Sequence, residues 1–186
     1  MDRDGTVCEE VGYVNHLDRS RLLPRSAEAI RRINEAGLLA FIITNQSGVA
    51  RGLFDEALVH QVHAKMARAL LEGGARLDGV YFCPHHPSEG TSPWRQACDC
   101  RKPRPGLLKR AAAEHGVDLG SSYMIGDTVL DLEAARSADA TGLLVLTGYG
   151  KGDLMYRIRP RGIDPAFIAT DLFEAVEWIL QRERSL

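Results

Sequence analysis

The sequence predicts an α/β fold in which a Rossmann-like parallel sheet carries helices on both faces. Short apolar runs at 38–43, 123–125 and 142–146 each lead into glycine or polar residues, and segments of helical length separate them. Short, continuously apolar runs are typical of strands that are buried on both faces. Their alternation with helices predicts a parallel sheet covered on both sides. A chain of 186 residues fits one domain, which we expect to cover 1–186.

Local patterns predict each element in chain order. Residues 8–24 show no period and are expected to form a loop. Helices are expected at 25–36 with Ser26 as its cap, 55–72, 105–116, 130–138, and 171–184 with Asp171 as its cap. Strands are expected at 38–43, 79–82, 123–125, 142–146 and 167–169, and a glycine-rich loop at 148–152. On the 55–72 helix, His60 and His63 are expected to be surface or half-buried side chains rather than ligands.

Bulk composition excludes several classes of function. The chain is 45% hydrophobic and 26% charged, with a net charge of −2, which gives no case for binding nucleic acid or an anionic membrane. No apolar run approaches the roughly 20 residues of a membrane span, and the charged start does not match a signal peptide. We therefore expect a cytoplasmic protein with no membrane or nucleic-acid partner.

Polar residues gather where the predicted strands end. Asp2 and Asp4 stand at the start of the chain, and Gly5-Thr6 follows them; taken alone, this pattern also fits a polar turn. In an open parallel sheet, ligands bind beyond the carboxyl ends of the strands. The side chains expected at that edge are Asp2, Asp4, Thr44, Asn45, Lys102, Asp127 and Asp131.

These residue types are what phosphoryl transfer through an aspartyl-phosphate requires. A carboxylate nucleophile divides hydrolysis into two easier steps. Because the phosphoryl group is anionic, the attack needs charge neutralisation, which Mg²⁺ held by carboxylates can supply. A lysine and a hydroxyl complete the electrostatic cradle, and a second acid protonates the leaving alkoxide and later activates water.

A second cluster predicts a structural zinc site in the loop over 83–100. Cys83-x-His85 and Cys98-x-Cys100 supply three thiolates and one imidazole, a closed tetrahedral set with no open position for catalysis. Bound Zn²⁺ orders a polar loop that would not fold by itself. His86 could replace His85, which we favour, and a reduced loop without metal is the plain alternative.

With these motifs in place, the sequence resembles the haloacid dehalogenase superfamily of phosphatases, and within it the histidinol-phosphatase subfamily. Segments 2–6, 12–14, 44–52 and 98–103 carry the resemblance, together with Gly126-Asp127-x-x-x-Asp131. It implies that Asp2 is the nucleophile and a Mg²⁺ ligand, and that Asp4 is the acid/base and offers its carbonyl to the metal. Thr44 and Lys102 would hold the phosphoryl group, Asp127 would bind Mg²⁺, and Asp131 would support Lys102 or the metal shell.

The resemblance also implies a substrate class. The expected substrate is a small phosphorylated sugar, a heptose 1,7-bisphosphate that loses its C7 phosphate, and loops shape the pocket because no separate cap domain is expected. The implied substrate contacts are Glu10, Tyr13, Asn45, Gln46, Ser47, Arg51 and Arg101, with Arg101 on the remaining phosphate. A monomer is expected. The alternatives are histidinol phosphate as substrate, a nonspecific phosphomonoesterase, and a zinc-stabilised protein without activity.

Two positions depart from the family pattern. Thr128 stands where the family often has a lysine, so one substrate or phosphate contact is expected to be lost. Only Met1 precedes Asp2, whereas a typical strand needs about five residues. We therefore expect that the sequence as given starts too late, and that the sheet lacks its first, central strand. Such a chain should be poorly stable and nearly inactive until apolar residues are restored upstream.

Overall fold

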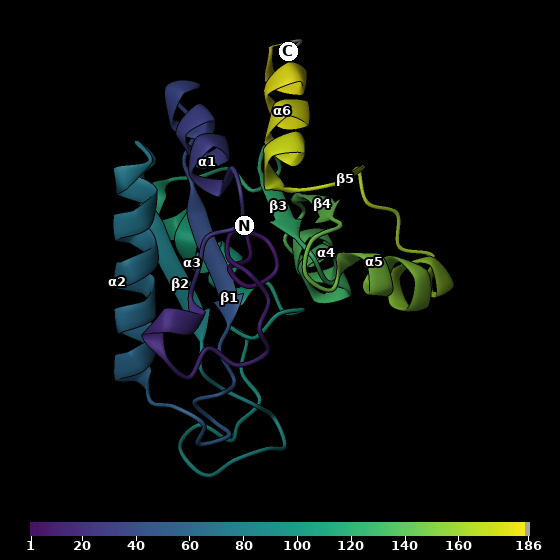
Figure 1. Ribbon diagram of the computed structural model, residues 1–186. Helices are drawn as coiled ribbons and strands as arrows, with labels where there is room; N and C mark the ends of the chain where they lie inside the picture. Colours follow the sequence, from purple (N-terminus) through teal and green to yellow (C-terminus); the bar gives the residue numbers. More distant parts are fainter. Residues whose placement is uncertain (185–186) are drawn as a thin grey trace.

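Parallel strands form the centre of the fold in two groups (Figure 1). The computed structural model describes residues 1–184. In one group β1 (Phe41–Asn45) pairs with β2 (Gly79–Cys83), with Phe41 opposite Gly79. In the other, β4 (Thr141–Val145) lies between β3 (Tyr123–Gly126) and β5 (Phe167–Ala169). The expected α/β architecture with parallel strands is confirmed.

Helices cover both faces of these strands. On one face, α1 (Ser26–Glu35), α2 (Glu56–Glu72) and α6 (Leu172–Glu183) pack into one hydrophobic cluster. On the other face, α3 (Gly106–His115) and α4 (Val129–Ser137) form a second cluster. Within residues 1–184, no helix is both long and apolar enough to cross a membrane.

Consecutive strand residues divide between these two clusters. Ile42 and Ile125 belong to the cluster with α1 and α6, whereas their neighbours Ile43 and Met124 belong to the cluster with α3 and α4. All four are at most 2% exposed. Side chains alternate across a strand, so an unbroken apolar run is what a strand covered on both faces requires.

The predicted loop over 148–152 is wrong from Gly150 onward. The chain forms α5 (Gly150–Asp153), which continues through a π-helical turn and a 3-10 turn as far as Arg161. Tertiary contacts explain this helix, since the buried Asp153 carboxylate accepts the Val129 N–H at 2.7 Å. Ile158, which is fully buried, packs with residues of α4 and β4.

Some predicted boundaries also differ. Ser26 is not the cap of α1, because its hydroxyl donates to the Val7 carbonyl at 2.8 Å and Arg25 takes the capping position. The first apolar run pairs only from Phe41, since the N–H of Ala40 donates to the Asp78 carboxylate at 2.8 Å. The predicted cap of α6 is confirmed, because Asp171 accepts the Glu174 N–H at 2.9 Å.

A slot one strand wide separates the two groups of strands. Among residues 1–184, β1 pairs only with β2, and β3 only with β4. The backbone at the start of the chain bridges the slot at one end: Ile43 N–H donates to the Met1 carbonyl at 2.8 Å, and Asp2 N–H donates to the Ile125 carbonyl at 2.9 Å. Adjacent strands lie about 4.8 Å apart, so a backbone that bonds to both edges fills one strand position.

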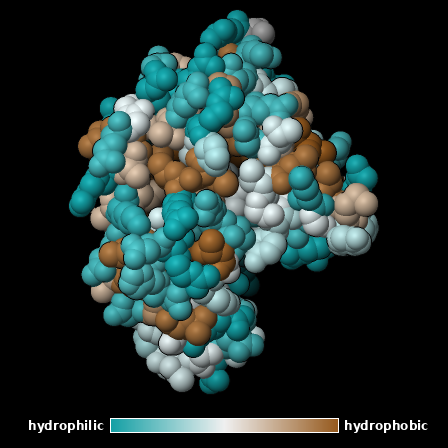
Figure 2. All heavy atoms as spheres, viewed as in Figure 1, coloured by the Kyte–Doolittle hydropathy of each residue, from teal (hydrophilic) through white to brown (hydrophobic). Residues whose placement is uncertain are grey.

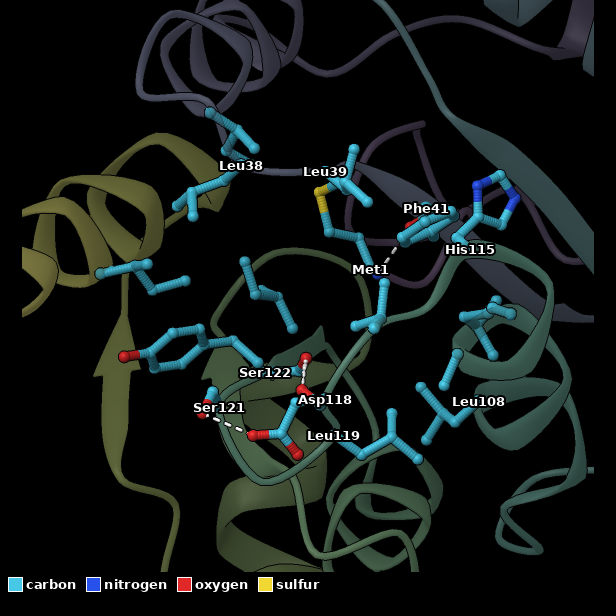
Figure 3. Close-up of a pocket in the computed structure, with 18 of the residues that line it drawn as sticks. Met1, Leu38, Leu39, Phe41, Leu108, His115, Asp118, Leu119, Ser121 and Ser122 are labelled. Carbon is cyan, nitrogen blue, oxygen red and sulfur yellow. Dashed lines mark hydrogen bonds between the residues drawn. The ribbon is translucent and has the colours of Figure 1, made fainter.

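Behind this bridge lies a cavity of about 390 Å³. Met1 projects among its lining residues in Figure 3, and a hydrophobic patch lies beside the N-terminus below α1 in Figure 2. The apolar lining comes from both flanking strands and from helices on both faces and includes Phe41, Ile43, Tyr123, Ile125, Leu108 and Ile179. The slot therefore has the polarity of a sheet interior.

His63 on α2 is a buried titratable group, contrary to the expectation of a surface or half-buried side chain. It is 7% exposed and lies against Arg3, whereas His60, one turn earlier, is exposed. Burial, with the Arg3 charge and His60 adding to it, lowers the pKa of His63 to about 3. The unfolded chain therefore binds a proton at this site at a higher pH than the folded chain does.

We expect His63 to make stability depend on pH. The pKa of His63 is lower in the folded chain than in the unfolded chain. Its contribution to the free energy of unfolding is therefore complete above the unfolded pKa of 6.5 and is lost as the pH falls towards the folded pKa of about 3. Between pH 7 and pH 5 this loss is about 2 kcal/mol. In urea unfolding at both pH values, His63→Gln should lose less stability than the wild type by about that amount. His60→Gln is the matched control, and equal losses for all three proteins would contradict the prediction.

Candidate active site

The carboxyl ends of β1 and β3 and the start of the chain meet around one small pocket. Its volume is about 130 Å³. The β1 and β3 segments enter it where the strand stops and the backbone turns, which frees polar side chains from the sheet. The lining residues are Asp2, Asp4, Glu10, Gly12, Tyr13, Thr44, Asn45, Gln46, Ser47, Gly48, Asp127, Thr128 and Tyr149.

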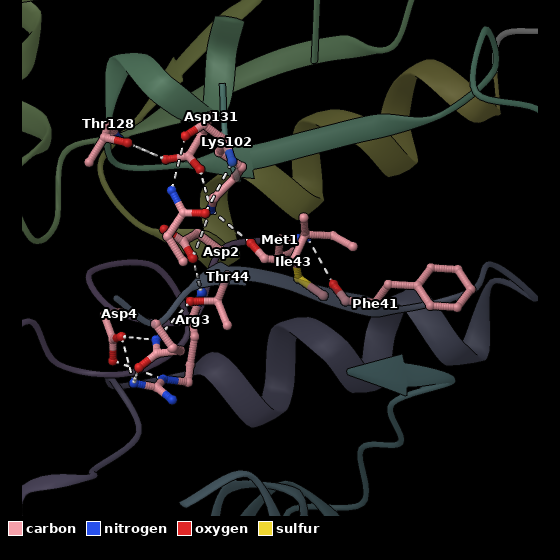
Figure 4. A network of polar contacts seen from close by, with 12 residues as sticks. Met1, Asp2, Arg3, Asp4, Phe41, Ile43, Thr44, Lys102, Thr128 and Asp131 are labelled. Atoms are coloured by element: carbon pink, nitrogen blue, oxygen red, sulfur yellow. Dashed lines mark hydrogen bonds and ion pairs between the residues drawn. The ribbon is translucent and has the colours of Figure 1, made fainter. Parts of the chain in front are cut away.

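Lys102 joins two of the predicted carboxylates beneath this pocket (Figure 4). Its ammonium lies 3.0 Å from Asp2 Oδ1 and 2.6 Å from Asp131 Oδ1, and it donates to the Ile43 carbonyl at 2.8 Å. The side chain is 2% exposed. Although burial lowers the pKa of Lys102, the Asp131 and Asp2 carboxylates raise it overall. The lysine is therefore held charged beside Asp2.

The second oxygen of Asp131 fixes the start of α4. Asp131 Oδ2 accepts the Thr128 N–H at 3.0 Å and the Thr128 hydroxyl at 2.7 Å. Thr128 is thus part of a capping box, in which the side chains of the cap and of the third helical residue bond to each other's backbone. These bonds leave Asp131 Oδ1 to face Lys102.

Asp2, Asp127 and Asp131 could together hold a cation, because one oxygen of each lies within 4.8 Å of the others. Asp127 Oδ2 accepts the Tyr149 N–H at 2.9 Å, whereas its buried Oδ1 has no hydrogen-bond partner among the described residues. Burial, together with the Asp2 and Asp131 charges, raises the pKa of Asp127 to about 8. When ionised, three carboxylates beside one ammonium carry two uncompensated charges, which fits a divalent cation with oxygen ligands.

Two glycines allow the Asp127 carboxylate to sit this deep. Gly5 and Gly148 have φ values of 77° and 52°, in the left-handed region that favours glycine. At either position an added Cβ would collide with the Asp127 carboxylate. Gly5 therefore serves close packing around the candidate cation site as well as the turn.

Asp4 and Thr44 both line the pocket and accept hydrogen bonds from the same side-chain amide, that of Gln46. Gln46 Nε2 donates to Asp4 Oδ2 and to the Thr44 hydroxyl, at 3.0 Å in both cases. Both Thr44 and Gln46 are buried, whereas the Asp4 side chain is 16% exposed. Asp4 also forms a 2.7 Å ion pair with Arg3, a residue that the sequence analysis did not assign to the site.

Not all predicted substrate contacts lie in the pocket. Glu10, Tyr13, Asn45, Gln46 and Ser47 line it. Asn45 also holds Lys102 in place, since its amide exchanges two 3.1 Å hydrogen bonds with the lysine backbone.

The two predicted arginines lie beside the 83–100 loop instead. Arg51 contacts His86 Nε2 at 3.2 Å and Glu89 at 3.7 Å. Arg101 donates to the His85 carbonyl at 3.1 Å. Neither arginine lines the pocket around Asp2.

Tyr149 is a pocket residue that the sequence analysis missed. It is 54% exposed, and the Glu10 charge, followed by burial and the Asp127 charge, raises its pKa. The signal was present, because Tyr149 follows an apolar strand at the edge where the other site residues gather.

The four predicted zinc ligands converge on one point. One atom from each of Cys83, His85, Cys98 and Cys100 lies within 4.8 Å of the others. The sulfur-to-sulfur distances are 3.1 to 3.5 Å, and His85 Nδ1 lies 3.4 Å from the Cys100 sulfur. Burial raises the pKa of the Cys83 and Cys100 thiols. His86 turns away from the cluster and contacts Arg51. Three sulfurs and one ring nitrogen are a donor set that suits zinc.

Comparisons with known proteins agree with these motifs. A family model described as HAD-hydrolase-like matches residues 99–175. A D-glycero-beta-D-manno-heptose-1,7-bisphosphate 7-phosphatase of Yersinia pestis is 42% identical over 149 residues, which are 80% of this chain and 79% of the relative. A D-glycero-D-manno-heptose-1,7-bisphosphate 7-phosphatase of Thermosynechococcus vestitus is 40% identical over 183 residues, 96% of this chain and 93% of the relative.

A solved structure gives the same result. The D,D-heptose 1,7-bisphosphate phosphatase of B. bronchiseptica, in complex with magnesium and phosphate, superposes with a TM-score of 0.86 at 38% identity. The match covers 97% of this chain and 96% of that one. The resemblance drawn from the motifs is confirmed. The chain therefore belongs to the haloacid dehalogenase-like hydrolases and, within them, to the same family of phosphoric monoester hydrolases as these heptose bisphosphate phosphatases.

Proposed function

We propose that this protein is a Mg²⁺-dependent phosphatase that acts through an aspartyl-phosphate and removes the C7 phosphate of a heptose 1,7-bisphosphate. The observation that carries the proposal is the meeting of Asp2, Asp4, Thr44 and Asp127 in one pocket, with Lys102 and Asp131 beneath them. Relatives named as heptose-1,7-bisphosphate 7-phosphatases match over 80% or more of the chain, which supports the substrate in this proposal.

Asp2 is the proposed nucleophile. Both Lys102 and the Arg3 N–H contact its Oδ1, at 3.0 and 2.7 Å, so Oδ2 is the oxygen available to attack phosphorus. A new bond forms between Asp2 Oδ2 and phosphorus as the bond from phosphorus to the sugar oxygen breaks. Lys102 supplies a fixed positive charge beside the reacting group, where it needs no reorganisation during the reaction.

Asp4 is the proposed acid and base. It gives a proton to the departing sugar oxygen in the first step and takes one from the attacking water in the second, which releases phosphate and restores Asp2. Its carboxylate lines the same pocket as Asp2, as both roles require.

Asp2 and Asp127, with the carbonyl of Asp4, would hold the Mg²⁺, and Asp131 would support them. When bound, the ion neutralises negative charge on the carboxylates and on the phosphoryl group. The buried Oδ1 of Asp127, which has no hydrogen-bond partner within residues 1–184, supports this assignment. A neighbouring solved structure that contains magnesium and phosphate supports it independently.

The proposed substrate contacts fall into two groups. The first group lines the pocket, where it can meet the sugar hydroxyls: Glu10, Tyr13, Asn45, Gln46 and Ser47. Arg51 and Arg101, beside the 83–100 loop, are the proposed contacts of the phosphate that remains on the sugar. An arginine suits this task because its fork is always charged and matches a phosphate.

We also propose that catalysis requires a strand in the slot between β1 and β3. The occupant is an extended apolar segment joined to Met1 and parallel to both neighbours. The bridge from Met1 and Asp2 to Ile43 and Ile125 is the observation that supports it, together with the apolar lining of the cavity. Such a strand would fix the position of Asp2 along the sheet, and with it the contact between the Asp2 carboxylate and Lys102.

For the cluster of three cysteines and His85 we propose a structural role for Zn²⁺. The loop from 84 to 100 has no helix or ladder of its own to hold it, apart from an isolated bridge between His86 and Arg95. A metal cross-link at its two ends would order the loop and would hold Arg101 in place.

The function is tested by phosphate release with Mg²⁺ from heptose 1,7-bisphosphate and histidinol phosphate in parallel. We expect preferred turnover of the bisphosphate, loss of activity with a chelator, and recovery when Mg²⁺ is restored. Asp2→Asn should reduce kcat by at least about 10³-fold, because the amide is not a nucleophile. Asp18→Asn, an exposed carboxylate outside the pocket, is the matched control. Preference for histidinol phosphate, or turnover that survives Asp2→Asn, would overturn the assignment.

The slot is tested by adding a segment of five to six valine, isoleucine and leucine residues directly before Met1. Each buried side chain of this kind contributes about 2 kcal/mol, and ordering each residue costs about 1.5 kcal/mol. The net gain over the segment is therefore about 3 kcal/mol, and the melting temperature should rise by on the order of 10 °C. Turnover should rise with it. An equally long glycine and serine extension is the control. The proposal fails if both extensions behave alike in melting and in protection of the Ile43 and Asp2 amides from hydrogen exchange.

The ligand assignment is tested by measuring the zinc content of variants at a cluster cysteine and at Cys8, the one cysteine of residues 1–184 that lies outside the cluster. Cys98→Ser should lose bound zinc, as measured by atomic emission, and should melt at a lower temperature. Cys8→Ser should keep its zinc, because Cys8 lies in the core, outside the cluster. Equal zinc content in both variants would contradict the ligand assignment.

A further inference from the structure

Arg3 is a charged side chain buried at the centre of the site. It is 1% exposed, although it stands between the two aspartates of the first motif. A buried charge is costly unless it is paired and its donors are satisfied. Its guanidinium meets both oxygens of one carboxylate: Nε donates to Asp4 Oδ1 at 3.0 Å and Nη2 to Asp4 Oδ2 at 2.7 Å (Figure 4). This two-point contact fixes the plane of the carboxylate.

Two further side chains hold the guanidinium from behind. Nη2 also donates to Gln46 Oε1 at 2.9 Å, and Nη1 lies 3.1 Å from His63 Nε2. The Gln46 amide returns to Asp4 Oδ2 at 3.0 Å and closes a ring of hydrogen bonds. Because the contacts lie on separate sides of the guanidinium, it cannot turn without breaking several of them.

His63 acts as an acceptor in this ring. A neutral imidazole has one nitrogen with a free lone pair, and the neighbouring arginine can only donate. Nε2 therefore accepts from Arg3, and the ring proton resides on Nδ1. His63 reaches Arg3 from α2, across 60 residues of chain, which is why His63 does not stand out as part of the site in the sequence.

The ring leaves one position for a proton on Asp4. A carboxylate offers about four lone-pair positions. Arg3 Nη2 and Gln46 occupy both positions of Oδ2, and Arg3 Nε occupies one of Oδ1. One lone pair of Oδ1 remains.

We propose that Arg3, supported by Gln46 and His63, is the positioning residue that directs the transferable proton of Asp4 to Oδ1. This inference rests on the proposed phosphatase function. It goes beyond that function by assigning roles to Arg3 and His63, and a second role to Gln46. Acid and base catalysis depends first on the geometry of the proton donor, so the cluster governs kcat rather than substrate binding.

The test compares leaving groups. A sugar alkoxide needs a proton as it departs, whereas p-nitrophenolate does not. Arg3→Lys, which keeps the charge but loses the two-point contact, should reduce kcat for the sugar phosphate by about 10-fold or more with KM within about threefold. In a single turnover, the burst of p-nitrophenolate should change by less than about threefold. Arg110→Lys, an exposed arginine paired with Glu114, should leave both rates unchanged.

A double-mutant cycle separates positioning from a structural role. In an Asp4→Asn background, Arg3→Lys should cause no further loss in sugar phosphate turnover, because its effect passes through Asp4. Additive losses, equal losses on both leaving groups, or a raised KM would overturn the proposal.

His63 provides an independent arm if the Arg3 variants do not fold. His63→Leu should reduce kcat for the sugar phosphate, His63→Gln should restore much of it by supplying an acceptor, and His60→Leu should leave it unchanged. No difference between His63→Leu and His60→Leu would overturn the role of His63. If the wild-type protein hydrolyses no phosphomonoester, with or without the added strand, the proposed function itself is overturned. That outcome differs from a failure of the positioning role, in which the wild-type protein is active but the variants do not behave as expected.

Discussion

The position of the whole site depends on the backbone hydrogen bonds that the first two residues make across the slot. Met1 accepts from Ile43 on one side, and Asp2 donates to Ile125 on the other. They join the β1 and β2 pair to the sheet of β3, β4 and β5, and the groups that converge on Asp2 come from both halves. Lys102 follows the loop after β2, and Asp127 and Asp131 follow β3. A shift of one residue in this bridge would turn the Asp2 side chain to the other face.

Charge balance is the second constraint. The carboxylates of Asp2, Asp127 and Asp131 are drawn together by the fold and face one buried ammonium. Burial is the main cause of the raised pKa of Asp127, and repulsion from the nearby Asp2 and Asp131 charges adds to it. A divalent cation relieves that repulsion, and an anionic phosphoryl group can then approach. On the other side of Asp2, Arg3 balances Asp4 separately, so the two aspartates of one motif have different electrostatic surroundings.

Sequence patterns predicted much of the fold because burial on both faces leaves a direct mark. The runs at β1, β3 and β4 are apolar without alternation, and helices lie on both faces. Predictions failed where one long-range contact outweighed a local preference. Ser26 bonds to Val7 instead of capping its helix, and Asp153 stabilises a helix in a glycine-rich stretch by binding Val129. The Asp78 carboxylate accepts a hydrogen bond from the Ala40 N–H, so β1 begins only at Phe41.

By itself, the sequence determined which functional groups the candidate sites contain and the order in which these groups follow the strands. Carboxylates, a lysine, and a set of cysteines with one histidine can be recognised because their chemistry depends on residue type and close spacing. Only the tertiary structure decided which of them meet. It separated His85 from His86, placed Arg51 and Arg101 outside the pocket, and brought His63 to Arg3 across 60 residues of chain. Such pairings depend on how helices pack against the sheet, and the period of a single helix carries no record of what its buried face will touch.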